Sequence, residues 1–427
     1  MSKNWKKGTI CIQGGYTPKA GETRVLPIYQ STTYKYEDPD QVAALFDLEA
    51  EGHMYSRISN PTVAAFEEKV SALEGGVGAV AVSAGQTATA LAILNICKTG
   101  DHVVAASTLY GGTFSLLSTT LKKFGIDVTF VNPDSDEEEI LKCFKENTRA
   151  IFGETIGNPG LNILDFEKFS SVAKKKQVPF IVDNTIATPY LCNPLKLGAN
   201  IVVHSTTKYI DGHATSIGGI IVDGGNFNWD NGKYLELIEP DPSYHGVKYV
   251  EKFGNAAYIV KVRVQLLRDL GTCTSPFNAF LFNLGLETLH LRMERHSENA
   301  FKLAKYLEKH EKVSWVSYPL LESHTTYPLA KKYLPKGASG ILTFGINGGI
   351  EAGKKFIRNL ELAALVVHLG DARTSVLHPA STTHRQLTEE QQLASGVTPD
   401  LIRVSVGIED IEDIIADFQQ SLENLGN

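Results

Sequence analysis

The sequence predicts an α/β protein whose large domain holds a mostly parallel sheet and whose carboxyl-terminal domain is a smaller α/β unit. The middle of the chain alternates short apolar runs with helical patterns, and several runs end in small or polar residues. Strands that alternate with helices form mostly parallel sheets, which bind ligands at the carboxyl ends of their strands. The expected strands are His102–Ala106, Asp127–Val131, Arg149–Gly153, Pro179–Val182, Ile201–His204 and Gly218–Val222.

The carboxyl-terminal region begins with a long helical pattern from Asn278 to Lys309. Two further expected strands, Ser314–Ser317 and Gly340–Ile346, belong to the smaller domain. Residues before about Pro61 have few periodic elements and suit an extended arm that packs on a neighbouring subunit. The expected division is an arm over residues 1–60, a large domain over 61–260 and a carboxyl-terminal domain over 261–427.

The first candidate site residue is Lys208, which lies among small hydroxyl residues directly after the strand Ile201–His204. A lysine at the end of a buried strand can have a lowered pKa and attack an aldehyde, which holds an aldehyde cofactor covalently. A solvated turn is the alternative, and this motif alone favours the turn.

A second candidate, Asp183, ends the apolar strand Pro179–Val182. A carboxylate at that position can accept the N–H of a pyridinium ring and keep the ring an electron sink. The alternative is an ordinary turn or helix-capping aspartate.

A third motif runs from Val80 through the small residues of the following turn into a helix that begins near Gln86. Free amides at a helix N-terminus bind anions, so Gly85 and Gln86 are expected to hold a phosphate. Ser205 and Thr207 supply further hydroxyl donors. Sites for a phosphate, a ring nitrogen and an aldehyde at three strand ends together indicate an enzyme that uses pyridoxal phosphate.

The composition fits a soluble enzyme, with 43% hydrophobic residues in a chain of 427 and a net charge of −7. No basic stripe stands out, which argues against nucleic acid as a partner. The sequence contains no apolar leader and no apolar span of membrane length, so we expect a cytoplasmic protein that does not bind a membrane.

The cysteines show neither C-x-x-C spacing nor another metal-binding pattern, and the histidines form no H-E-x-x-H motif. We therefore expect no disulfide framework and no metal site. The five thiols are Cys11, Cys97, Cys143, Cys192 and Cys273.

With these motifs, nearly the whole chain resembles the fold-type I pyridoxal-phosphate enzymes of the Cys/Met metabolism family. The resemblance implies a mostly parallel seven-stranded sheet in the large domain and pyridoxal 5'-phosphate as the cofactor. Within that family, residues 239–297, 370–373 and 378–384 resemble the O-acetylhomoserine sulfhydrylase branch.

The resemblance also implies a site shared between subunits of a homotetramer built from dimers. Tyr55 and Arg57 then bind the phosphate of the neighbouring subunit's cofactor, and Tyr55 also contacts the substrate. Arginine suits a phosphate because its planar fork donates two hydrogen bonds. The alternative is an exposed turn arginine in a monomer.

Three more residues take their roles from the family. Tyr110 stacks on the cofactor ring and assists departure of the leaving group, although a core tyrosine is the plain alternative. Asn158 contacts the cofactor's phenolic oxygen and the substrate carboxylate; without the resemblance it is a turn residue. Arg403, in an apolar strand, needs an anion. From the sequence alone, a structural salt bridge and an amino-acid carboxylate are equally good partners for Arg403, and the family favours the carboxylate.

The expected reaction is a γ-replacement in which O-acetyl-L-homoserine and sulfide, or methanethiol, give homocysteine, or methionine, and acetate. A cystathionine γ-synthase or a methionine γ-lyase is the alternative, and Gly112 stands where the lyases tend to have cysteine. His368 departs from the family, which often has serine or another small residue there. A cofactor-binding protein without turnover is a weaker alternative, and a nicotinamide dehydrogenase lacks its G-x-G-x-x-G motif.

Overall fold

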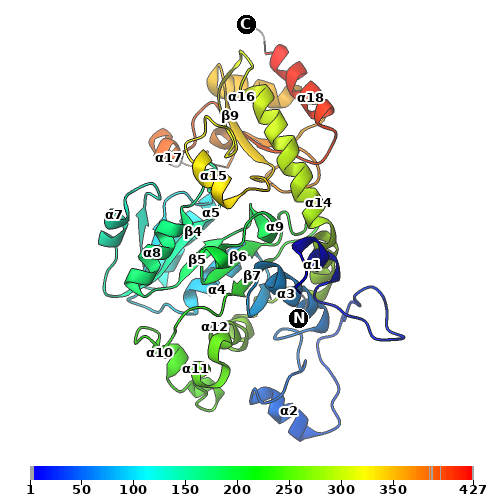
Figure 1. Cartoon of the computed structure of the whole chain (residues 1–427), viewed down its shortest axis with the longest axis vertical. Coiled ribbons are helices and arrows are strands. Elements are labelled where there is room, and N and C mark those ends of the chain that lie inside the picture. The colour runs from blue at the N-terminus through cyan, green and yellow to red at the C-terminus, as the bar shows by residue number, and fades with distance from the viewer. Residues whose placement is uncertain (1–3, 384, 386–387, 395, 426–427) are drawn as a thin grey trace.

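The computed structural model describes residues 4–383, 385, 388–394 and 396–425, so His384 of the last resemblance segment lies outside it. Figure 1 shows a large α/β domain in the middle of the molecule and a smaller one above it. The long helix α14 (Pro276–Leu307) runs alongside both domains. Helix α2 (Pro39–Phe46) lies at the lower edge, away from both sheets.

The large domain contains a seven-stranded sheet with the order β1-β7-β6-β5-β4-β2-β3. Strand β7 is antiparallel to both β1 and β6, and the remaining neighbours are parallel. The expectation of a mostly parallel seven-stranded sheet is therefore confirmed. The strands are β1 (Gly78–Val82), β2 (His102–Ala106), β3 (Asp127–Val131), β4 (Thr148–Glu154), β5 (Phe180–Asp183), β6 (Ile201–Ser205) and β7 (Gly219–Asp223).

Helices cover the faces of this sheet, which explains why its central strands are continuous apolar runs. All five residues of β2 are buried, as are the first four of β6. The helices of this part are α3 (Pro61–Glu74), α4 (Gly85–Leu94), α5 (Gly111–Ser115), α6 (Leu121–Lys123), α7 (Glu137–Lys142), α8 (Phe166–Lys176), α9 (Thr188–Leu191), α10 (Leu235–Ile238), α11 (Tyr249–Phe253), α12 (Ala257–Lys261) and α13 (Arg268–Leu270).

The smaller domain packs helices on a five-stranded sheet with the order β10-β11-β12-β9-β8. Its core includes the buried rings of Phe344, Phe356 and Phe418. Its elements after α14 are β8 (Val313–Ser317), α15 (Tyr327–Tyr333), β9 (Ile341–Ile346), α16 (Gly349–Asn359), β10 (Ala364–Leu365), β11 (Ser375–Leu377), α17 (Glu389–Ala394), β12 (Leu401–Ser405) and α18 (Ile411–Glu423).

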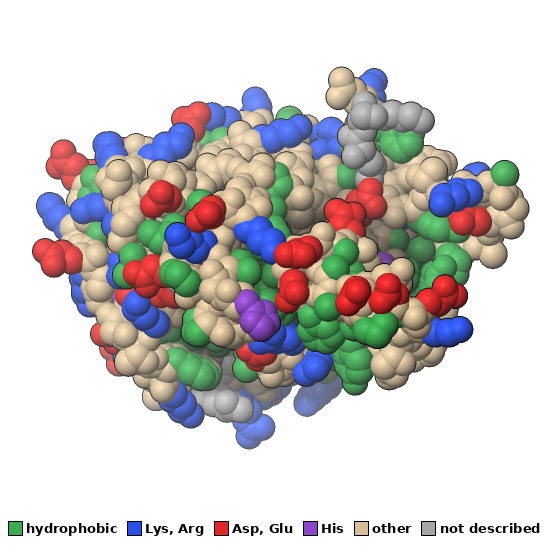
Figure 2. Space-filling model, turned by 90° about the horizontal axis from the view of Figure 1, so that it is seen from below, with side chains coloured by type: hydrophobic (Ala, Val, Ile, Leu, Met, Phe, Trp, Pro, Cys, Tyr) green, Lys and Arg blue, Asp and Glu red, His purple; other side chains and the backbone are tan. Residues whose placement is uncertain are grey.

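The amino-terminal segment is less extended than its sequence predicts, because it contains α2 and also helix α1 (Lys7–Gln13). Helix α1 packs on α3 and α14 of the same chain through the buried Cys11. Val25 and Phe46 are 58% and 53% exposed. Figure 2, the view from below, shows hydrophobic side chains exposed between acidic and basic ones. The packing of this segment on a second subunit and the domain limits stay predictions.

Two general properties concern the described residues alone. None of their helices combines the length and the apolar character that crossing a bilayer requires. Their histidine, cysteine, aspartate and glutamate side chains do not gather in a group of three that could hold a metal ion.

Replacing Phe344 with alanine should lower the free energy of unfolding by about 3–5 kcal/mol, since the cavity left by a buried phenylalanine is seldom refilled. Urea unfolding followed by circular dichroism measures the loss. Phe301→Ala is the control, because Phe301 is 37% exposed, and its cost should be about 1 kcal/mol. Equal costs for the two variants would contradict the assignment of the Phe344 cluster as the core of this domain.

Candidate active site

Lys208 lies in the turn that follows β6, where the Lys208 amide donates to the Ser205 carbonyl oxygen at 3.3 Å. The adjacent Thr206 amide donates to the Gly218 carbonyl oxygen at 3.0 Å, which ties the turn to the start of β7. Burial and then the charge of Arg403 lower the pKa of the Lys208 amine to about 8. A much larger fraction of this amine than of an ordinary lysine is therefore neutral and nucleophilic near neutral pH.

Asp183 ends β5, and Glu154 ends the adjacent parallel strand β4 directly opposite it. The Thr185 amide donates to Asp183 Oδ1 at 2.9 Å. Burial raises the pKa of Asp183, and its hydrogen bonds with Thr185 and the charge of His204 oppose that rise. Asp183 is thus placed to accept a hydrogen bond from a cationic ring nitrogen, which would offset the cost of its burial.

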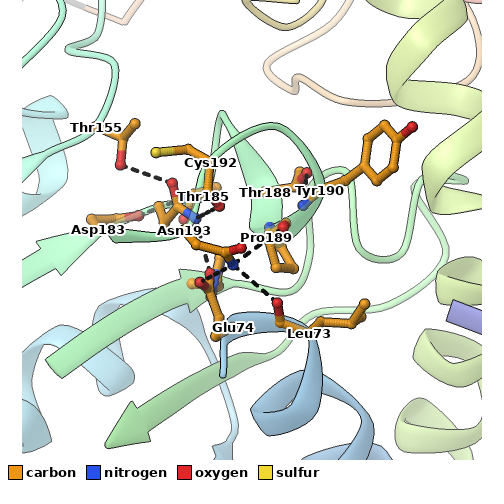
Figure 3. A network of polar contacts seen from close by, with 12 residues as sticks. Leu73, Glu74, Thr155, Asp183, Thr185, Thr188, Pro189, Tyr190, Cys192 and Asn193 are labelled. Atoms are coloured by element: carbon orange, nitrogen blue, oxygen red, sulfur yellow. Dashed lines mark hydrogen bonds and ion pairs between the residues drawn. The ribbon is translucent and has the colours of Figure 1, made fainter. Parts of the chain in front are cut away.

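A buried polar network lies behind Asp183, at the side of the sheet where α3 ends (Figure 3). Asn184 accepts from the Thr155 hydroxyl at 2.8 Å and donates to Glu74 Oε1 at 2.9 Å. The Nε2 atom of His204 lies 2.8 Å from the same carboxylate oxygen. Because these partners come from four separate elements, the network fixes the ends of β4, β5 and β6 relative to α3.

Gly85 and Ser205 form the cradle expected for the phosphate. A Cβ atom on Gly85 would lie 2.5 Å from Ser205 Cβ and 2.8 Å from Ser205 Cα, so only glycine lets the start of α4 approach the Lys208 turn. The side-chain oxygen of Gln86 is buried and has no partner among the described residues. The amides at the start of α4 and the Ser205 hydroxyl can donate to a phosphate group, whereas Gln86 Oε1 only accepts hydrogen bonds and does not add to that fit. Thr207, by contrast, exchanges hydrogen bonds with the Gly218 backbone, at 3.0 and 3.2 Å.

Tyr110 lies at the start of α5 with 49% of its side chain exposed. Its amide donates to Glu154 Oε1 at 2.8 Å, which joins this turn to the end of β4. Its ring folds over Gly112, where a Cβ atom would lie 2.5 Å from Tyr110 Cε1 and 2.9 Å from Gln86 Nε2. Tyr110 is therefore an accessible ring next to the phosphate cradle, as a residue that stacks on a cofactor must be.

Arg403 comes from β12 of the smaller domain, which brings a cation to the Lys208 turn. Within the described residues, its guanidinium forms no ion pair, and Nη2 donates to the His368 carbonyl oxygen at 3.2 Å. Burial lowers the pKa of Arg403, while Tyr110 and Tyr209 raise it. A half-buried guanidinium without an acidic partner favours an external carboxylate over the structural salt bridge.

Among the described residues, no hydrogen bond or ion pair joins Tyr55, Arg57 or Asn158 to this group. Arg57 donates to the Arg268 carbonyl oxygen at 2.9 Å and lies 5.4 Å from the centre of the Tyr55 ring. Tyr55 is 42% exposed, and Asn158 is buried in the loop after β4. The roles of these three residues stay predictions.

Some site residues were missed at the sequence level. Glu154 could have been found from the sequence, because it is a carboxylate at a strand end like Asp183. Burial and then the charge of Asp183 raise the pKa of Glu154 well above the usual range. Nothing local indicates that Glu74, 130 residues before His204, contacts it. His368 is visible as a departure from the family pattern, and its Nδ1 atom lies 3.4 Å from Lys208 Nζ.

Substituting alanine for Gly85 should weaken binding of the expected pyridoxal phosphate at least about tenfold, because the added Cβ would press on the Ser205 backbone and open the cradle. Fluorescence titration of the stripped protein with cofactor measures the change. Gly160→Ala is the matched control, since its Cβ would meet nothing closer than 3.8 Å. A Gly85→Ala protein that binds cofactor as tightly as the control would disprove the cradle.

Comparisons with known proteins extend this picture. The sequence profile described as Cys/Met metabolism PLP-dependent enzyme matches residues 8–423. The chain is 52% identical to the O-acetyl-L-homoserine sulfhydrylase of Leptospira meyeri, covering 100% of this chain and 98% of that protein. It is 51% identical to the homocysteine/cysteine synthase of Saccharomyces cerevisiae, covering 95% of this chain and 94% of that protein.

Solved structures of the same family have a fold similar to that of this chain. An O-acetylhomoserine (thiol)-lyase from Campylobacter jejuni, which carries N'-pyridoxyl-lysine-5'-monophosphate, matches with a TM-score of 0.95 and 39% identity, covering 98% of this chain and 100% of that chain. The metB protein of Corynebacterium glutamicum matches with a TM-score of 0.85 and 35% identity, covering 99% of both chains. The expected fold-type I architecture is thus confirmed. The chain belongs to the Cys/Met metabolism family of PLP-dependent enzymes, and its cofactor is pyridoxal 5'-phosphate.

Proposed function

We propose that the protein is an O-acetylhomoserine sulfhydrylase, which converts O-acetyl-L-homoserine and sulfide to L-homocysteine and acetate. The observation that carries this proposal is the pairing of a half-buried Lys208, whose pKa is about 8, with an Arg403 that has no acidic partner among the described residues. That pair suits a substrate with both an amino-acid carboxylate and a Cα proton to remove. Relatives of about half identity bear the names of this activity.

The residues of the site would hold the cofactor and the substrate as follows. Lys208 would bind the aldehyde, Gly85, Gln86 and Ser205 would surround the phosphate, and Asp183 would accept the hydrogen of the ring nitrogen. When bound, pyridoxal phosphate supplies an electron sink for the electron pairs left at the α and β carbons of the substrate. Arg403 binds the substrate carboxylate bidentately, which fixes the rest of the substrate over the Tyr110 turn.

When its amine is free, Lys208 would do the proton chemistry of the reaction. With a pKa lowered to about 8, an appreciable fraction of the free amine is neutral near pH 7.5, so it can take the Cα proton and later return it. After a second proton leaves Cβ, the Cγ–O bond breaks and acetate departs with the electron pair. Hydrosulfide then forms the Cγ–S bond, and the protons return to Cβ and Cα.

Rival reactions differ in what reacts after acetate leaves. A cystathionine synthase uses the thiol of cysteine, and a lyase uses no nucleophile and releases a 2-oxo acid and ammonia. Gly112 stands where methionine γ-lyases tend to have a cysteine, and a Cβ atom there would lie 2.5 Å from Tyr110 Cε1, so a cysteine would require the Tyr110 ring to shift. This observation supports replacement over elimination.

We also infer that the protein works in the cytoplasm as a homotetramer built from dimers with shared sites. The five free thiols suit a reducing compartment. Exposed apolar side chains on the amino-terminal segment, such as Val25 and Phe46, suit an arm that packs on a second copy. Tyr55 and Arg57 then reach the phosphate of that copy, and Asn158 contacts its own cofactor and substrate. Sedimentation velocity tests the tetramer.

Purified protein given O-acetyl-L-homoserine should form homocysteine only when sulfide is present, and Lys208→Ala should lower that rate at least about 1000-fold because it removes both the covalent anchor and the base. Homocysteine, 2-oxobutyrate and acetate are followed together by mass spectrometry. If 2-oxobutyrate forms at the same rate with and without sulfide, the protein is a lyase and the proposal is wrong. Methanethiol in place of sulfide tests the second nucleophile.

Replacing Arg403 with lysine should raise the KM for O-acetyl-L-homoserine about 10- to 100-fold, since one charge-assisted hydrogen bond is lost. The KM for sulfide should stay unchanged. Arg295→Lys on the exposed surface of α14 is the control. A normal KM in the Arg403→Lys protein would show that the substrate carboxylate binds elsewhere.

A further inference from the structure

His368 lies in the loop after β10, next to the Lys208 turn. The Nδ1 atom of His368 lies 3.4 Å from Lys208 Nζ, and the His368 carbonyl oxygen accepts from Arg403 Nη2 at 3.2 Å. The loop is held in place two residues later, where the Gly370 amide donates to the Ser405 hydroxyl at 2.9 Å. Gly370 has a φ of +81°, and a Cβ there would lie 2.8 Å from the Tyr209 amide nitrogen. The imidazole is therefore held beside the lysine amine by a fixed backbone.

The environment of the ring determines how its two nitrogens are used. Burial, then Lys208 and Arg403, lower the pKa of His368, while Asp371 and Asp211 raise it. A neutral ring is favoured, and because a lysine ammonium group only donates, Nδ1 is the acceptor and Nε2 carries the hydrogen. The Nε2 atom is buried and has no partner among the described residues. Lys208 is thus the only side chain in the described part of the protein that bonds to the ring.

We propose that His368 is a positioning residue for Lys208, whose free amine it holds through Nδ1 while that amine moves protons between the substrate carbons. The proposal rests on the function proposed above, because proton transfer by the Lys208 amine belongs to that function, while the contact itself is made by the free amine. A hydrogen bond to the ammonium form also helps the amine to keep the proton it has just taken. The family often has a serine or another small residue here, so an imidazole beside the lysine is a departure of this chain from that pattern.

Competitive labelling with acetic anhydride tests the proposal without any substrate. The full-length protein, stripped of pyridoxal phosphate, is labelled from pH 6 to 10, and peptide mass spectrometry gives the pH midpoint for each lysine. In His368→Leu the midpoint of Lys208 should fall by about one pH unit, since the acceptor for the ammonium form is gone. In His368→Asn it should stay within about 0.3 units of the parent, because the side-chain oxygen of asparagine can replace Nδ1 as the acceptor.

Two controls separate this effect from a general loosening of the protein. Burial also lowers the pKa of Lys7 and Lys261 to about 8, so their midpoints in the same digests should not move. Val367→Ala alters the exposed neighbour of His368 and should leave Lys208 unchanged. An unchanged Lys208 midpoint in His368→Leu, or equal shifts in the leucine and asparagine variants, would overturn the proposal. If the Lys208 midpoint falls in His368→Leu as predicted but the parent protein forms no homocysteine, only the proposed function is overturned.

Discussion

The removal of the Lys208 amine from water is the constraint on which the rest of the site depends. An exposed lysine is almost wholly protonated near neutral pH and can neither attack an aldehyde nor take a proton from carbon. The structure places Lys208 one turn beyond a strand whose first four residues are buried, and brings the cation Arg403 close enough to act in the same direction as burial. A pKa of about 8 is the result, and it suits both tasks.

This constraint requires both domains. Lys208 and Asp183 belong to the large domain, whereas Arg403 and His368 come from the smaller one, so the site lies at the junction of the two domains. The residue after Lys208 helps to join the two, since the Gly340 amide donates to the Tyr209 hydroxyl at 3.0 Å. The buried Arg292 of α14 donates to the Tyr209 carbonyl oxygen at 2.8 Å. The two domains are therefore hydrogen-bonded together directly beside the Lys208 amine.

The sequence predicted what is local and periodic. Strands β2 and β3 have the bounds that their apolar runs predicted. Lys208, Asp183 and Gly85 lie at strand and helix ends as expected, and they lie close together because parallel strands bring their carboxyl ends to one edge of the sheet. Contacts between distant segments could not be read in this way. Glu74 reaches His204 only because α3 ends behind β6, and helices α1 and α2 are too short to show a clear period. The roles predicted for Tyr55 and Arg57 require a second subunit, so the contacts within one chain do not test them.

A lowered lysine pKa is not enough to identify the cofactor-binding lysine, because burial also lowers the pKa of Lys7 and Lys261 to about 8. Of these three lysines, only Lys208 also lies beside the expected phosphate cradle, a carboxylate at the next strand end and a guanidinium that has no acidic partner among the described residues. Reduction of the cofactor-loaded protein with sodium borohydride, followed by peptide mapping, tests this claim most directly. We predict a pyridoxyl group on Lys208 and none on the other two lysines. A pyridoxyl group on Lys7 or Lys261 in comparable amount would show that desolvation, and not the arrangement of strand ends, selects the lysine.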